Sequence, residues 1–223
     1  MAYTAGAITT QVQTRIRDTG FSSSTVLDLI NDAQNDVCNE YRFPFMQTFQ
    51  NYTLTADDED ITSGSGLPAA FVQALNLTVT SSGYERVIPI VSYDEVDENF
   101  PDPTDTTRHP ANVPQVGYYA DGTLNVYPVP NTAYTVKLTY YKKPTLLTAD
   151  GDVPEIPSEF QEILVLGAAF RALQIKDNYD QAGILQNAYD EKLQKLAVKY
   201  NQVQVGTPNR IRINRRGMGK TNF

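Results

Sequence analysis

The spacing of apolar residues changes twice along this chain, from a helical period to an alternating one and back again. The first apolar series recurs every four residues, at Ile8, Val12 and Ile16. It predicts a short helix that ends at Gly20. A second helix is predicted from the candidate N-cap serines at 22–24, with a 3.6-residue apolar period that Pro44 ends.

From residue 49 onward, apolar and polar residues alternate, most clearly in residues 75–80 and 134–141. Alternation of this kind is typical of half-buried strands. Asp121 and Gly122 predict a two-residue hairpin turn between strands that contain residues 118–119 and 123–127. Four prolines and several acids between residues 94 and 114 predict a long surface loop that is available for contacts.

The helical period returns after residue 157. Ser158 and Gln161 have the spacing of a capping box, which predicts the start of a third helix. This helix is apolar around most of its circumference, so we expect one face to pack inside the subunit and another on a neighbouring copy. The residues expected at that contact are Leu164, Leu166 and Phe170. A fourth helix is predicted over residues 179–203.

These patterns predict an α+β fold. We expect a helical bundle of about four helices with an inserted, mostly antiparallel β domain and an extended C-terminal arm. The predicted ranges are 1–48 for the first half of the helical part, 49–157 for the β domain, 158–205 for the second half of the helical part and 206–223 for the arm.

Charge is divided unevenly along the chain. The two helical ranges together carry a net charge of −3, the β range −10 and the arm +5, within a formal total of −8. Apolar side chains lie between the cations of the arm, which favours a partner-binding segment over a solvated terminus without a function. The arm residues expected to bind a partner are Arg210, Ile211, Arg212, Ile213, Arg215, Arg216, Lys220 and Phe223.

One cysteine and one histidine are too few soft ligands for a zinc or iron–sulfur site, so we expect no metal and no cofactor. Cys38 lies on the apolar stripe of the second helix and is expected to be a core residue. His109 has no partnered nucleophile and is expected to be a solvated loop residue. The longest apolar run, residues 163–170, is shorter than the roughly 20 residues of a membrane span, and we expect neither a span nor secretion.

Several weaker patterns could in principle indicate chemistry. Residues 217–221 resemble the end of a phosphate-binding loop but lack its first glycine and its flanking strand and helix. The acids at 57–60 and 150–152 lack the ligand spacing of a calcium loop and favour turns. Glu159 and Glu162 are a candidate acid–base pair for glycan hydrolysis, although acids are common at a helix start. We expect that the protein is not an enzyme. Fourteen tyrosines would suit either a stacking platform or packing in sheets.

An ordered series of short motifs runs through the middle of the chain. It consists of Leu67-Pro68-Ala69-Ala70-Phe71, Ser92-Tyr93-Asp94-Glu95, Leu124-Asn125-Val126-Tyr127-Pro128-Val129-Pro130 and Tyr140-Tyr141-Lys142-Lys143-Pro144. Residues 153–160 complete the series and lead into the apolar helix. In this order the motifs resemble the head-to-tail adaptor, or connector, proteins of tailed bacteriophages.

The resemblance implies a ring, a dodecamer in this family, that docks beneath the portal protein in the virion neck after assembly in the host cytoplasm. Genomic DNA would pass through its channel without specific binding, and a tail, nozzle or stopper protein would attach on the other side. Relatives extend C-terminal arms along the portal, so the resemblance assigns the arm residues named above to portal contact. We assign to the tail side the acids of the predicted loop, Asp94, Glu95, Asp97, Glu98, Asp102 and Asp105.

Other functions stay open at this point. The nearest is another neck or tail-completion protein, either a stopper or a tail terminator. A tail-associated glycan-binding or glycan-degrading protein would need a carboxylate pair in a cleft, and a DNA-binding protein would show salt-steep binding through the arm. The adaptor interpretation accounts at once for the insertion, the apolar third helix, the acidic loop and the basic arm.

Overall fold

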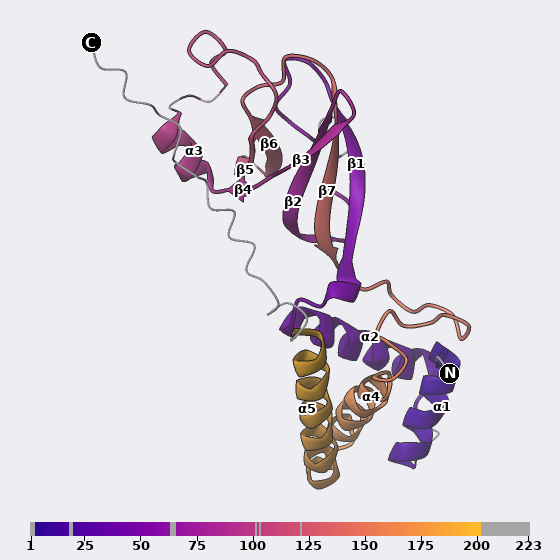
Figure 1. Cartoon of the computed structure of the whole chain (residues 1–223). Helices are drawn as coiled ribbons and strands as arrows, with labels where there is room; N and C mark the ends of the chain where they lie inside the picture. Colours follow the sequence, from indigo (N-terminus) through magenta and orange to yellow (C-terminus); the bar gives the residue numbers. More distant parts are fainter. Residues whose placement is uncertain are drawn as a thin grey trace.

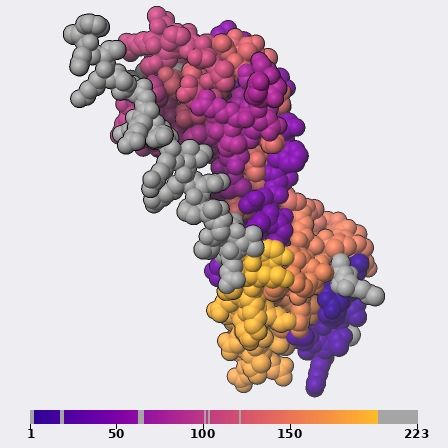
Figure 2. Space-filling model, viewed as in Figure 1, coloured from indigo at the N-terminus to yellow at the C-terminus, as the bar shows by residue number. Residues whose placement is uncertain are grey.

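The molecule is elongated (Figure 2). Its described residues form four helices at one end and two β-sheets and a short helix at the other (Figure 1). The computed structural model describes residues 3–17, 20–62, 66–100, 102, 104–120 and 122–201. The predicted α+β class, with a helical bundle and mostly antiparallel strands, is confirmed. The basic arm at 206–223 lies outside the described residues.

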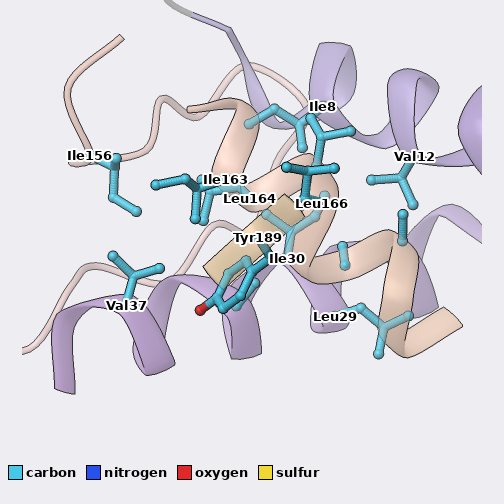
Figure 3. Close-up of a cluster of buried hydrophobic side chains, with 14 of the residues drawn as sticks. Ile8, Val12, Leu29, Ile30, Val37, Ile156, Ile163, Leu164, Leu166 and Tyr189 are labelled. Carbon is cyan, nitrogen blue, oxygen red and sulfur yellow. The ribbon is translucent and has the colours of Figure 1, made fainter. Parts of the chain in front are cut away.

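The helical end is built around one central helix. Its members are α1 (Ala5–Ile16), α2 (Ser23–Glu40), α4 (Glu162–Ile175) and α5 (Tyr179–Asn201). Helix α4 contacts the other three, and this position explains why it is apolar around its circumference. Figure 3 shows side chains from all four helices converging on one cluster, including Ile8, Ile30, Leu164 and Tyr189.

Two helix ends differ from their predictions. Helix α1 ends at Ile16 with Arg17 in the left-handed conformation, so Gly20 is not its C-cap. Helix α4 begins at Glu162, and the capping box predicted at Ser158 is wrong. The Gln161 side chain instead accepts a hydrogen bond from the Tyr3 backbone at 2.6 Å and donates one to the Ile156 carbonyl at 3.1 Å. The tertiary contacts of Gln161 therefore replace the local capping bond.

The larger sheet has the strand order β1 (Gln47–Leu54), β7 (Tyr134–Lys142), β2 (Phe71–Ser81) and β3 (Tyr84–Ile88), with every pair antiparallel. The smaller sheet consists of β4 (Ile90–Val91), β5 (Val116–Ala120) and β6 (Thr123–Tyr127), and β4 runs parallel to β5. The predicted hairpin is confirmed, because Ala120 lies opposite Thr123 and Gly122 has a φ of 80°. Side chains of β6 and of the larger sheet share a second core.

The two ends of the molecule meet at a narrow waist (Figure 2). A 3-10 turn, Pro44–Met46, leads from α2 into β1, and a long loop returns from β7 to α4. Asn31 of α2 holds this loop with two hydrogen bonds to the Leu147 backbone, at 3.0 and 2.8 Å. Leu147 and Ile156 of the loop belong to the helical core. Residues after β7 therefore stabilise the helices although they lie within the range predicted for the β domain.

Candidate interaction surfaces

The first candidate surface is acidic and lies at the end of the molecule remote from the bundle (Figure 1). Residues 94–99, predicted as part of a loop, instead belong to helix α3 (Tyr93–Asn99). The Ser92 side chain caps it by accepting a hydrogen bond from the Glu95 backbone, and Val96 is its buried anchor. The helix escaped prediction because its seven residues contain one buried apolar position, too few to show a period; its signal was the Ser92 and Glu95 capping box. The exposed acids on α3 are Asp94, Glu95, Asp97 and Glu98.

The other two acids of this surface belong to the turns after α3. Asp102 is exposed and accepts a hydrogen bond from the Thr104 hydroxyl at 3.1 Å. Asp105 accepts bonds from the backbone N–H groups of Thr107, at 2.9 Å, and Arg108. These bonds, the one from Thr107 first, lower the pKa of the Asp105 carboxyl below its usual range. Asp105 therefore shapes the turn, while the other five acids face solvent.

His109 does not lie free in solvent, contrary to the expectation from sequence. It is half-buried and meets the rings of Phe100 and Tyr127 at centroid distances of 5.9 and 5.7 Å. Phe100 in turn stacks on Tyr127 at 4.4 Å. This aromatic cluster fastens the segment after α3 onto β6, so the acidic surface rests on an ordered base.

Leu164, Leu166 and Phe170 lie inside the bundle of their own chain. All three are buried, and Figure 3 shows Leu164 and Leu166 within the helical core. Phe170 meets the Tyr189 ring at a centroid distance of 5.5 Å. Little of their surface remains for a neighbouring copy, and their role in subunit contact stays a prediction. Three exposed apolar residues of the bundle lie instead beside the turn from α4 to α5, and no sequence pattern singled them out: Ile175, Tyr179 and Ile184.

The arm residues Arg210, Ile211, Arg212, Ile213, Arg215, Arg216, Lys220 and Phe223 lie outside the described residues. The structure does describe the helix that leads to them. The Tyr200 ring, near the end of α5, packs edge-on against Phe45 at 5.4 Å and also meets Phe43 and Phe160. These contacts fix the end of α5 at the waist.

The candidates for chemistry have structural roles. Burial, and to a smaller extent the charge of Glu155, raises the pKa of Cys38 to about 12, which suppresses its thiolate. Glu162 accepts hydrogen bonds from Lys192 and Arg15, which lower the pKa of its carboxyl, whereas a general acid requires a raised pKa. Glu159 is paired with Lys199 at 2.6 Å.

The acids at 57–60 and 150–152 have structural partners. Asp58 accepts a hydrogen bond from the Asp60 backbone, and Asp60 lies in a β-bridge with Asn125 of β6. The Asp152 carboxylate accepts bonds from the backbone of Thr148 and Ala149, while the carbonyls of Asp150 and Asp152 accept bonds from the first turn of α1. Within the described part of the chain, no group of three or more candidate ligands could hold a metal ion. None of the described helices is long and apolar enough to span a membrane.

Comparison with known proteins gives one family. A search of curated proteins found no match. The model of the SU10 adaptor protein family matches residues 3–212, which include the whole bundle, both sheets and residues 206–212 of the arm. The α+β architecture and the ordered motifs agree with this match, and the chain therefore belongs to the SU10 adaptor protein family, a phage head-to-tail adaptor family.

Proposed function

We propose that this adaptor docks as a ring of twelve copies beneath the portal protein and provides the platform to which the tail attaches. The observation that carries the proposal is the family match over residues 3–212. The elongated shape supports it, since a protein that joins two partners needs two separate surfaces. Here the helical bundle and the acidic surface lie at opposite ends (Figure 1).

The charges suggest which segment meets which partner. The arm carries +5 and follows an α5 helix whose end is fixed at the waist. Eighteen residues can extend by up to roughly 60 Å, enough to reach along a portal subunit. The arm is our candidate for the portal contact. The acids on α3 and the turns after it are our candidates for the contact with a tail, nozzle or stopper protein.

The genome would pass through the ring without specific binding. The β range carries a net charge of −10, and carboxylates repel the DNA backbone, whereas cationic contacts supply most nonspecific affinity for DNA. A duplex would then slide through the channel. Such a role places the protein in the virion neck.

Co-sedimentation with the cognate portal tests the arm. We expect the full chain to bind, and a chain that ends at Gly206 to lose binding at least tenfold. A full-length variant with the five basic arm residues replaced by Gln should lose most of its binding, and wild-type binding should weaken with salt. As a control, Asp94→Asn combined with Asp97→Asn should leave portal binding unchanged. Tail binding without portal binding would contradict the proposal and favour a stopper position.

A further inference from the structure

Both edges of the larger sheet are open. The strand order places β1 at one edge and β3 at the other. Among the described residues, no backbone hydrogen bond reaches either strand from outside its sheet. Proteins usually protect an edge strand with charged residues or proline. Strand β1 is eight residues long and contains neither. An edge of this kind is suited to pairing with a further strand.

The two edges carry matching apolar side chains on one face. Phe49 of β1 is 62% exposed, and Val87 of β3 is 54% exposed. Residues directly opposite each other share a face of the sheet, as do residues two apart on one strand. Phe49 lies opposite Thr139, which is two residues from Lys137. Thr78 lies opposite both Lys137 and Val87, so Phe49 and Val87 are on the same face. This is the outer face, because the opposite face of the sheet covers the second core.

Strand direction allows the edges to join. Each step from β1 to β7, β2 and β3 is antiparallel, so β1 and β3 run in opposite directions. If a second copy places its β3 beside β1, the new pair is antiparallel and the outer faces remain continuous. Such a head-to-tail contact uses two different surfaces and is repeated by rotation, which is how rings close. Pairing of β1 with another β1 would leave Val87 uncovered.

We propose that neighbouring copies of this adaptor join through their sheets, with β1 of one copy paired to β3 of the next. This inference rests on the proposed ring and identifies the surface that connects its subunits. The favoured register places Val87 of one copy beside Phe49 of the next, and Glu85 then lies beside Asn51. Asn51 is already opposite Lys137, whose ammonium lies 5.9 Å from the centre of the Phe49 ring. Glu85 thus adds an opposite charge near Lys137.

Disulfide cross-linking tests the contact and its register. Opposite residues of an antiparallel pair have Cβ atoms about 4.5–5.5 Å apart, close enough to form a disulfide after small shifts. We expect Asn51→Cys combined with Glu85→Cys to give a ladder of covalent oligomers under mild oxidation. Each single variant, and Asn51→Cys combined with Val153→Cys, should give no ladder. The buried Cys38 should not interfere.

A charge at the edge gives the second test. Val87→Lys should reduce the cross-linked fraction at least tenfold, because it places an ammonium group beside Phe49 and Lys137. Val153→Lys is the matched control, since Val153 is 53% exposed and lies in the loop before α4. Circular dichroism should show that both variants remain folded.

Covalent oligomers are looked for after oxidation in two samples: the complex with the portal, and the concentrated protein alone. A ladder in either sample supports the edge contact. Its absence from both would overturn the contact, and if the portal is still bound the proposed function would survive. A ladder without portal binding would reject the proposed function and leave the contact between copies intact.

Discussion

Gly167 lies where α4 passes close to α2. A Cβ atom at this position would lie 2.7 Å from the Ala33 Cβ and 3.1 Å from Cε2 of Tyr189. The 2.7 Å distance is shorter than carbon atoms tolerate, and Ala33 has no flexible side chain that could move aside; the 3.1 Å distance is tight and would require a small shift of the Tyr189 ring. The small residue therefore permits the close approach of two helices. In the sequence, Gly167 is only one small residue within an apolar run.

We expect Gly167→Ala to destabilise the bundle by about 1–2 kcal/mol, because an overpacking cost of about 1–3 kcal/mol exceeds the helix-propensity gain of up to about 1 kcal/mol. The midpoint temperature of thermal unfolding should fall by roughly 2–8 °C. Gly183→Ala in α5 is the control, since nothing lies within 4 Å of its added Cβ. Its midpoint should rise. Equal shifts for the two variants would contradict the packing argument.

Among the elements, the sequence predicts long helices and strands well. It does not predict short elements, or element ends that depend on contacts with distant residues. Helix α2 buries one continuous stripe and strand β7 buries one face, so the spacing of their apolar residues shows a clear period in the sequence. Helix α3 has one buried apolar anchor, and the start of α4 depends on Gln161 binding Tyr3, 158 residues away. Local patterns contain no information on such a distant partner.

Glu162 connects three helices, since it lies on α4 and binds Arg15 of α1 and Lys192 of α5. Its carboxyl has a lowered pKa in the folded protein. The resulting stability is present above the unfolded pKa of about 4.3 and is lost as pH falls through the folded pKa. At pH 7, Glu162→Gln should lower the free energy of unfolding by about 0.5–1 kcal/mol, a value reduced for solvent screening because the side chain is 40% exposed.

Urea unfolding at pH 7 and at roughly pH 3, where most carboxyl groups are protonated, checks this expectation. The difference between Glu162→Gln and wild type should largely disappear at the lower pH. Glu191→Gln is a suitable control, because Glu191 pairs with Lys195 of the same helix and both side chains are well exposed. Its effect at pH 7 should be smaller. A difference for Glu162→Gln that persists unchanged in acid would exclude the ion pairs as its cause.

For the whole molecule, the proposed function rests on its two ends, and the proposed contact between copies rests on the two open edges of the larger sheet. The ends separate a helical surface from an acidic one, and the waist between them is fixed by the rings around Tyr200 and by the loop that Asn31 holds. The proposed contact between sheets would then arrange the copies side by side, with all bundles on one side of the ring and all acidic surfaces on the other.

The elongated shape can be measured directly. A compact chain of this length has a radius of gyration of about 17 Å. X-ray scattering from monomeric protein should give a clearly larger value. A chain that ends at residue 201 is the necessary control, since it removes the contribution of the C-terminal residues. A value at or below the compact one for this shorter chain would contradict the two-ended shape.

The sequence by itself determined the secondary structure of most of the chain, the α+β class and the separation of an acidic body from a basic arm. Periodicity and charge are local properties, and each can be read from a short segment. Only the tertiary structure decided the strand order, the central position of α4, the close approach at Gly167 and the exposure of Phe49 and Val87 at opposite edges of one sheet. These features depend on pairings between residues far apart in the chain, and no local period specifies which strand lies beside which.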